Sequence, residues 1–131
     1  MTVRFVILVL MLAGALSRAD TVVAAELPAL TEITITSSLD GTPQKSQYWV
    51  PESASTQSRP LLVMPHSWSA DYRQKADAWM KEAVQRDWIY IHPNFRGPNN
   101  RPQACGSELA RQDVLDAIDD AIRRFKVDES R

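Results

Sequence analysis

Two histidines in this sequence stand where acid–base or metal chemistry could take place. His66 and Ser67 are adjacent and follow the apolar run Leu61–Met64, and His92 ends a second apolar run. Neighbouring side chains on a strand point apart, so His66 and Ser67 are not expected to form a nucleophile–base pair. A zinc site made from His66 and His92 lacks a third ligand at suitable spacing. The favoured interpretation is therefore two strand-end histidines that form hydrogen bonds to loops.

The segment His66-Ser67-Trp68 has the most favourable position for a functional site. It follows Leu61–Met64, which is continuously apolar and predicts a strand with helices on both faces. Ligands in open α/β sheets bind beyond the carboxyl ends of such strands. We therefore expect a site at this segment.

An antiparallel hairpin is predicted before this strand. Thr31–Leu39 alternates polar and apolar residues, Asp40-Gly41 marks a turn, and Ser46–Val50 suits the returning strand. The hairpin should lie at the edge of the sheet. The polar stretch 51–60, bounded by prolines, predicts an exposed loop that separates two strands rather than two domains.

A helix and a second buried strand are predicted next. Asp71 is expected to cap the helix, with Gln74 three residues later as in a capping box. The buried stripe of this helix should consist of Ala76, Trp79, Met80, Ala83 and Val84. Trp88–His92 is rich in β-branched and aromatic residues, so it predicts a strand parallel to Leu61–Met64.

A second helix is predicted after a loop rich in Pro, Asn and Gly. Ser107 is expected to cap it. Its buried stripe should contain Val114, Ala117, Ile118, Ala121, Ile122 and Phe125. Its outer face should carry Asp116, Asp119, Asp120, Arg123 and Arg124. In a βαβα series, the polar residues 127–131 should then lead to another parallel strand.

The order of these elements resembles the α/β-hydrolase superfamily. Two segments carry the resemblance, Pro65-His66-Ser67-Trp68 and Asn94-Phe95-Arg96-Gly97-Pro98-Asn99. The chain resembles the catalytic domain of prolyl-oligopeptidase-like (S9-type) peptidases and secreted esterases over roughly Ile33 to Arg131. This implies a partial α/β fold, with an N-terminal antiparallel hairpin and then a parallel βαβα unit, truncated before the nucleophile elbow.

The resemblance implies a role for the segment after the first buried strand. In the family, this strand ends in a His-Gly-Gly-type turn whose backbone N–H groups help to form the oxyanion hole. The matching positions here are His66, Ser67 and Trp68, so both glycines are replaced by residues with side chains. A reshaped oxyanion-hole region is therefore expected.

The resemblance also implies a supporting loop. The family's Asn-aromatic-Arg-Gly segment is matched by Asn94-Phe95-Arg96-Gly97, and the helix after it has an Asp-Val step like Asp113-Val114. By resemblance, Asn94, Arg96, Gly97 and Asp113 support the loop near the active site, with Arg96 paired to Asp113. The alternative is an ordinary surface ion pair, worth at most about 1 kcal/mol.

The nucleophile motif of the family does not occur in this sequence. The family order places Gly-x-Ser-x-Gly on the next strand and turn, followed by the acid and the histidine. No Gly-x-Ser-x-Gly is present, and Ser107 is better explained as a helix cap than as a nucleophile. No catalytic residue is therefore expected in this chain, and an acyl-enzyme cannot form in these residues alone.

The N-terminal residues predict export. Arg4 precedes the apolar run Phe5–Leu16 and small residues that end at Ala25, as in a secretory signal peptide. The run is shorter than the roughly 20 apolar residues that a membrane-spanning helix needs, which makes a retained anchor the weaker alternative. We expect a signal peptide at 1–25, the hydrolase-like part at 26–131, a secreted or periplasmic location and no stable membrane span after cleavage. Ala19 or Ala24 are alternative cleavage sites.

Charge and cysteine content narrow the range of partners. The net charge is −1, from 15 basic and 16 acidic side chains, which gives no broad positive field for nucleic acid or anionic lipid. Cys105 is the only cysteine, so an internal disulfide and a multi-cysteine metal site are excluded. Cys105 is expected to be buried or paired with a cysteine elsewhere. No metal or cofactor is expected.

Two hypotheses follow. The first is an N-terminal fragment of an exported serine hydrolase, which cleaves an ester or peptide bond through an acyl-enzyme in its full-length form and is inactive by itself. Its substrate would be a peptide, a carbohydrate ester or a polyester. The alternative is a non-catalytic secreted module that binds carbohydrate or peptide through Trp68, Tyr72 and Phe95.

Overall fold

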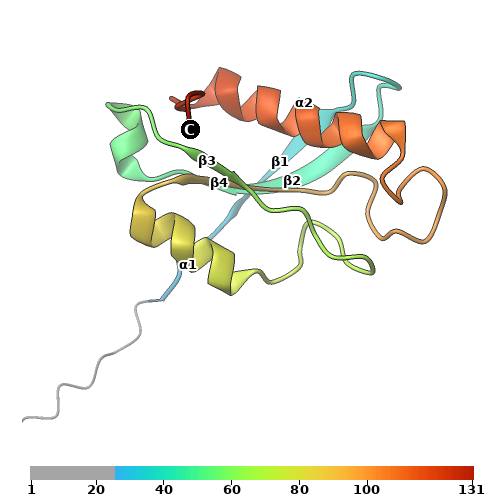
Figure 1. The fold of residues 1–131 in the computed structure, drawn as a ribbon, viewed down its shortest axis with the longest axis horizontal. Coiled ribbons are helices and arrows are strands. Elements are labelled where there is room, and N and C mark those ends of the chain that lie inside the picture. Colours follow the sequence, from blue (N-terminus) through green and yellow to red (C-terminus); the bar gives the residue numbers. More distant parts are fainter. Residues whose placement is uncertain (1–25) are drawn as a thin grey trace, which may run out of the picture.

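The computed structural model describes residues 26–131, so the predicted signal peptide lies outside the described residues. The elements are β1 (Thr31–Thr36), β2 (Pro43–Trp49), η1 (Glu52–Ser55), β3 (Leu61–Val63), α1 (Asp77–Arg86), β4 (Ile89–Pro93) and α2 (Glu108–Arg124) (Figure 1). None of the helices in this described part is long and apolar enough to cross a membrane.

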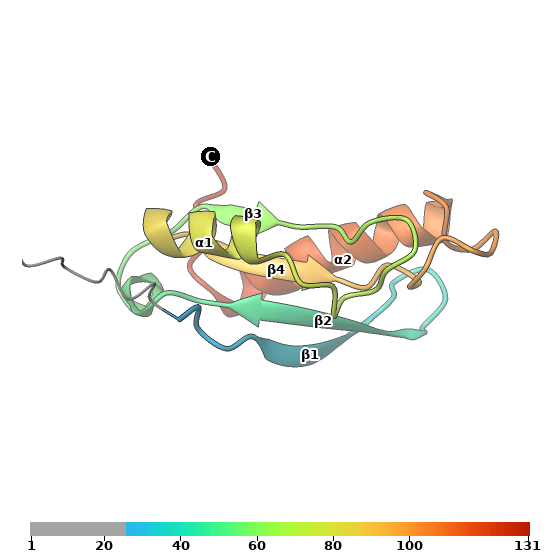
Figure 2. The same cartoon turned by 90° about the horizontal axis from the view of Figure 1, so that it is seen from below.

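The strands form one mixed sheet in the order β1-β2-β4-β3. Figure 2 shows the four strands side by side in this order. β1 and β2 form the predicted antiparallel hairpin, with Thr31 opposite Tyr48. β3 and β4 are parallel, with Leu61 opposite Ile89, as the βαβ pattern predicts. β2 also pairs antiparallel with β4, and this pairing joins the hairpin to the parallel unit.

β4 supplies the core on both faces of the sheet. All of its residues are buried. Ile91 packs with Ala117 and Ala121 of α2, whereas Tyr90 packs with Met80 and other residues around α1 on the opposite face. Successive residues of a strand face opposite sides, so one apolar and aromatic strand can anchor both helices. Each large side chain buried in this way contributes about 1.5–3 kcal/mol.

The buried face of α2 is rotated relative to the predicted one, although Ala117 and Ala121 are buried as predicted. Its buried residues are Ala110, Asp113, Asp116, Ala117, Asp120 and Ala121. The prediction that Asp116 and Asp120 lie on the outer face is therefore wrong, and Val114, Ile118 and Ile122 are only half-buried. The reason is that the small alanine side chains allow α2 to approach the sheet closely, while the buried carboxylates accept hydrogen bonds from nearby donors. Asp116 accepts from the Ser38 N–H at 2.7 Å, and Asp120 accepts from Arg124 at 2.6 Å.

α1 begins at Asp77, later than predicted. Its N-cap is Ala76, which makes no side-chain cap. The predicted capping box is wrong because Asp71 and Gln74 instead fold the preceding loop. Asp71 accepts from the Arg73 N–H at 2.8 Å, and Gln74 accepts from the Ser67 N–H at 2.7 Å. Trp79, predicted on the buried stripe, is 51% exposed.

The predicted loop between β2 and β3 contains the short helix η1, in which Ala54 is buried. Ser53 donates from its hydroxyl to Asp87 at 2.6 Å, and Arg59 pairs with the same carboxylate at 2.8 Å. This loop is therefore attached to the end of α1, and half of the residues in the stretch 51–60 are exposed.

Replacing Ala117 by Leu should destabilise the fold by about 1–3 kcal/mol, because the larger side chain pushes α2 away from the sheet. Leu115→Ala is the matched control on the same helix. Leu115 is 52% exposed, so this change should stay within about 0.5 kcal/mol. Urea unfolding of the two variants measures the difference, and equal midpoints would contradict the close packing of α2.

Candidate functional site

His66 joins the loops that follow β3 and β4. Its Nε2 lies 2.6 Å from the carbonyl oxygen of Asn94, and its Nδ1 lies 3.0 Å from the carbonyl oxygen of Ser67. The ring stacks on Phe95 with centroids 4.0 Å apart, and the residue is only 5% exposed. Both ring nitrogens thus face main-chain oxygens, as expected for a strand-end histidine rather than for a base paired with the Ser67 hydroxyl.

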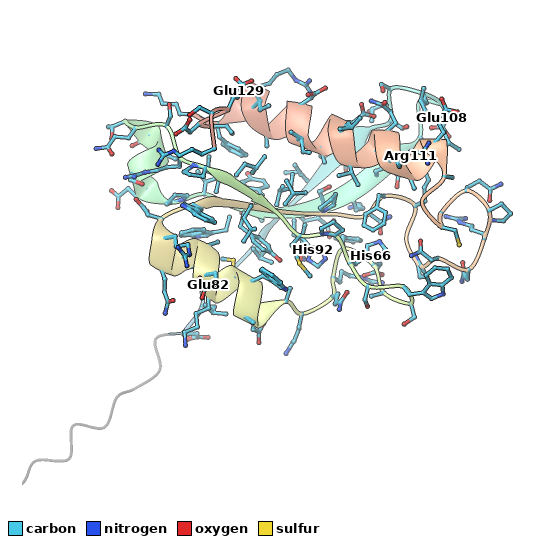
Figure 3. All side chains as sticks on the ribbon, viewed as in Figure 1. His66, Glu82, His92, Glu108, Arg111 and Glu129 are labelled. Carbon is cyan, nitrogen blue, oxygen red and sulfur yellow. The ribbon has the colours of Figure 1, made fainter. Side chains whose placement is uncertain are left out.

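His92 lies near His66 in Figure 3 but has a different environment. It is fully buried in β4, and neither ring nitrogen has a hydrogen-bond partner among the described residues. The prediction of hydrogen bonds to a loop is therefore wrong for His92, because its side chain lies on the core face beside Tyr90, with ring centroids 6.3 Å apart. Burial lowers the pKa of His92 to about 4, reinforced by His66 and opposed by Asp71.

A metal site is not formed around these histidines. Within residues 26–131, the structure places no three His, Cys, Asp or Glu side chains together as metal ligands. His66 uses both ring nitrogens at carbonyl oxygens, and the nitrogens of His92 are enclosed. The region is thus organised by hydrogen bonds and stacking.

The segment 66–68 forms a folded turn at the carboxyl end of β3. The Ser67 N–H donates to Gln74 Oε1 at 2.7 Å, and the Ser67 carbonyl accepts from the Ala70 N–H at 3.1 Å. The Trp68 side chain is 67% exposed, while its carbonyl accepts from the Asn99 N–H at 2.8 Å. Gln74 would therefore have to release the Ser67 N–H before this group could bind an oxyanion.

The loop after β4 has an unusual backbone. Phe95, Arg96 and Gly97 have φ angles of 33°, 79° and 69°, and the Gly97 N–H donates to the Asn94 carbonyl at 2.9 Å. This is a tight turn with two left-handed central residues, which costs roughly 1–2 kcal/mol for each non-glycine residue. Contacts of the Phe95 and Arg96 side chains must offset this cost.

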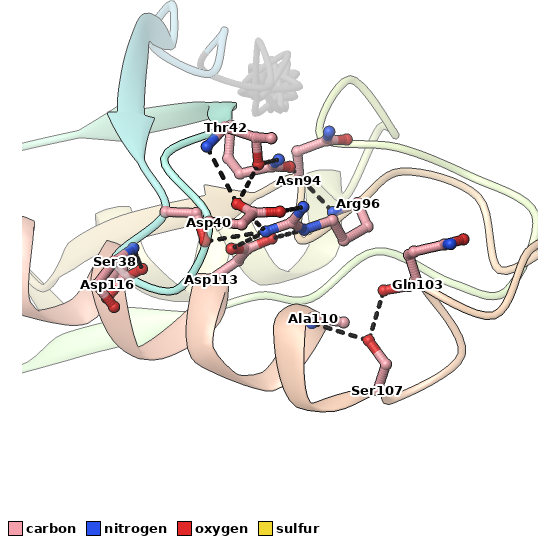
Figure 4. Close-up of polar contacts among 12 residues, drawn as sticks. Ser38, Asp40, Thr42, Asn94, Arg96, Gln103, Ser107, Ala110, Asp113 and Asp116 are labelled. Carbon is pink, nitrogen blue, oxygen red and sulfur yellow. Dashed lines mark hydrogen bonds and ion pairs between the residues drawn. The ribbon is translucent and has the colours of Figure 1, made fainter.

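The main contacts are those of the Arg96 guanidinium, shown in Figure 4. Its Nε and one terminal nitrogen donate to Asp113 at 2.5 and 3.0 Å. Its terminal nitrogens donate to Asp40 at 2.7 and 3.0 Å, and one of them also donates to the Ser37 hydroxyl at 2.9 Å. The loop after β4 is thereby attached to both α2 and the β1–β2 turn.

The Arg96–Asp113 pair is buried, with side-chain exposures of 7% and 0%. The alternative, an ordinary surface ion pair, is therefore wrong. The limit of about 1 kcal/mol for such a pair does not apply to Arg96 and Asp113. Hydrogen bonds from Arg96 and then from Thr42 hold the pKa of Asp40 well below its usual value. Asp40 and Asp113 together raise the pKa of Arg96. Arg96 and Asp40 therefore stay charged across the physiological pH range.

Asp40 and Ser37 are partners that the sequence did not predict. The pairing of β2 with β4 sets Ser46 opposite Pro93, so the turn before β2 lies beside the loop after β4. The sequence marks Asp40-Gly41 as a turn, but nothing in it reveals which strand lies next to the hairpin. The predicted contact of Arg96 with Asp113 is present, and its supporting role in catalysis stays a prediction.

The loop before α2 is held by local hydrogen bonds. Ser107 caps α2 as predicted, since its hydroxyl accepts from the Ala110 N–H at 3.1 Å. Cys105 is exposed, so the expectation that it is buried is wrong. The side chain of Asn99 accepts from the Cys105 N–H at 2.9 Å, which keeps the cysteine at the surface of a tight loop.

Replacing Arg96 by Ala should destabilise the fold by about 3–5 kcal/mol, because Asp113 would be left as an unpaired buried charge. Arg96→Lys retains the charge but loses the two-pronged geometry, so a smaller loss is expected. Arg123→Ala is the control, since this arginine is 66% exposed in its pair with Asp120. Denaturant unfolding should show the largest loss of unfolding free energy for R96A, a smaller loss for R96K and the smallest for the control R123A. Equal losses for R96A and R123A would contradict the conclusion that the Arg96–Asp113 pair is buried.

Stability should fall on mild acidification because of His92. Its pKa is lowered to about 4 in the folded state, so its contribution is fully present above the unfolded value of 6.5 and is lost as pH falls towards 4. The expected loss is on the order of 2 kcal/mol. Unfolding midpoints between pH 7 and pH 4.5 measure it. His92→Phe should flatten the curve, and an unchanged slope in this variant would contradict the assignment.

Comparison with known proteins gives matches among solved structures, while no family model and no curated protein matches. An S-formylglutathione hydrolase from Staphylococcus aureus matches 79% of this chain with a TM-score of 0.57 and 18% identity. A ferulic acid esterase from Anaeromyces mucronatus matches 79% with a TM-score of 0.54 and 10% identity. A thermostable esterase matches 76% with a TM-score of 0.54 and 15% identity.

The chain spans less than half the length of these solved structures, covering 44%, 46% and 32% of their chains. At these identities the similarity concerns the fold. The resemblance to the prolyl-oligopeptidase-like subtype stays a prediction. The described residues form part of an α/β-hydrolase fold, as the sequence predicts.

Proposed function

We propose that this chain is the N-terminal portion of an exported serine hydrolase that acts on an ester substrate. The observation that carries the proposal is that 76–79% of this chain matches less than half of each of several solved hydrolases and esterases. An ester is preferred to a peptide because two of the matched enzymes are named as esterases and the third as an S-formylglutathione hydrolase. Export rests on the signal-peptide pattern of residues 1–25.

The residues of this chain would organise the site rather than attack the substrate. The backbone at Ser67 and Trp68 lies at the carboxyl edge of β3, where an oxyanion could be bound once Gln74 releases the Ser67 N–H. His66 holds this segment against the loop after β4. Arg96 fixes that loop on α2. The nucleophile, its base and the acid would come from residues outside this sequence.

The alternative binding module has one supporting observation, the 67% exposure of Trp68. The other two aromatic residues do not extend this surface. Phe95 is stacked on His66, and the Tyr72 hydroxyl donates to Glu32 at 2.9 Å. A single exposed tryptophan gives a small platform for a sugar or peptide, so the hydrolase is the better-supported function.

The coding sequence beyond codon 131 tests the proposal. We expect the frame to continue into an apolar strand and a Gly-x-Ser-x-Gly turn within roughly 10–15 residues. The extended protein should hydrolyse a short-chain p-nitrophenyl ester, and its Ser→Ala variant should lose this activity. The 131-residue chain should show none. A stop codon after Arg131 would contradict the proposal and favour the binding module.

A further inference from the structure

β1 lies at one outer edge of the sheet and has an unpaired side. The Ser37 N–H donates to the Thr42 carbonyl across the hairpin at 2.9 Å, so the backbone groups of Ser37 face β2. These groups alternate in direction along an antiparallel strand, and those of Glu32, Thr34 and Thr36 therefore point outward. Figure 2 shows β1 as the outermost strand, with no described helix or strand beyond it.

This outer edge has none of the usual features that prevent strands from pairing. The sequence of Thr31–Thr36 is rich in β-branched residues and contains neither proline nor lysine. Its register with β2 is continuous, so no bulge turns the edge away. The residues just before β1 do not cover the edge, because Leu27 and Leu30 pack with the cluster around Met80 on the α1 face. The outer edge of β1 is therefore open to a further strand.

The edge is complementary to itself. A two-fold axis at Thr34 would pair β1 antiparallel with β1 of a second copy, and the two Thr34 residues would lie opposite each other. In this register, Ile33 lies opposite Ile35 of the other copy, and Glu32 lies opposite Thr36. The isoleucines extend the apolar cluster under α2, and no like charges are directly opposite.

Charged residues of α2 lie beside this edge. Ala121 packs with Ile35 of β1 and Ile91 of β4, so α2 lies over β2, the strand between them. Asp119 and Arg123 belong to the side of α2 that lines a hollow next to β1, and both are exposed. A strand spacing of about 4.8 Å sets the two α2 helices about 14 Å apart in the pair, a gap that an arginine and an aspartate can span.

The two-fold axis brings opposite charges together. Because Ile35 packs with Ala121 and is next to Thr34, the axis passes close to Ala121. Asp119 lies on one side of this level and Arg123 on the other. The second α2 helix runs in the opposite direction, so each Asp119 faces the Arg123 of the other copy. Sheet twist makes the two helices cross, but groups this close to the axis stay near each other.

We propose that this chain forms a symmetric dimer in which the outer edges of two β1 strands pair antiparallel, centred on Thr34. Three features support it, namely the outward backbone groups of β1, its self-complementary sequence and the opposed charges of Asp119 and Arg123. A second copy is the occupant because a single register satisfies the backbone, the isoleucines and the charges together. The inference is independent of the proposed function. The axis reverses the strand direction, so the carboxyl edges that carry His66 would lie at opposite ends of the joined sheet.

Sedimentation of the full chain over a range of concentrations tests the dimer. We expect a concentration-dependent equilibrium between monomer and dimer. Thr34→Pro removes an outward N–H and leaves the bonds to β2 in place. The two Thr34 residues would exchange two hydrogen bonds, so T34P should raise the dissociation constant at least about tenfold. Val63→Pro is the matched control at the other edge of the sheet. The Met64 N–H donates to Ile91 of β4, so the Val63 N–H points away from β4, and V63P should leave the dissociation constant unchanged.

Charge reversal tests the register. Asp119→Arg alone and Arg123→Asp alone each set like charges opposite each other, and each should weaken association by roughly threefold to tenfold. The double variant D119R/R123D restores the opposite charges and should recover the dissociation constant of the original chain. Hydrogen exchange at the Ile91 amide, in the central strand, reports whether each variant is folded.

A measurement without any variant complements these tests. In the original chain, the amides of Glu32, Thr34 and Thr36 should exchange at least about tenfold more slowly above the dissociation constant than below it. Exchange at Ile91 should not change with concentration.

Four results would overturn the inference. They are a monomer at every concentration with Ile91 protected, association that is unchanged in folded T34P, association that is lost in V63P, or a double charge variant that associates no better than the single ones. None of these readouts involves ester hydrolysis. Failure of the dimer is therefore distinguishable from failure of the proposed function.

Discussion

The Arg96 guanidinium lies between the carboxylates of Asp113 and Asp40, and it joins the loop after β4 to α2 and to the β1–β2 turn. A buried charge requires partners at fixed positions, because an unpaired one costs several kcal/mol. This requirement sets how α2 lies on the sheet, since Asp113 must reach the guanidinium from its buried face. The ion pairs also hold Arg96 in its left-handed backbone conformation, which a glycine would adopt at a lower cost.

The same arrangement defines the carboxyl edge of the sheet. With the loop after β4 fixed by Arg96, the Asn94 carbonyl is in place for His66, and His66 in turn holds the segment after β3. Two loops that are far apart in the sequence thus become one surface. The two His66 contacts are made to backbone oxygens, so they hold the paths of both loops at this surface.

The sequence was a good guide to elements with a local signal. The alternation in Thr31–Leu39 and the apolar run Trp88–His92 each predicted a strand, and both are present. The pairing of β2 with β4 could not be predicted, because strand neighbours depend on contacts distant in sequence. The partnership of Asp40 with Arg96 depends on that pairing. The burial of Asp116 in α2 was not predicted, because hydrophobicity alone places this residue outside, whereas a nearby backbone donor makes its burial acceptable.

The sequence separation of the Arg96 contacts affects the order in which this region can form. Asp40 precedes Arg96 by 56 residues, and Asp113 follows it by 17. During synthesis, the hairpin and β4 are made before α2. The strained turn at Phe95 and Arg96 then has only part of its compensation, because half of the ion-pair cluster has not been made. The edge that carries His66 can therefore complete its contacts only after α2 has been made and has packed on the sheet.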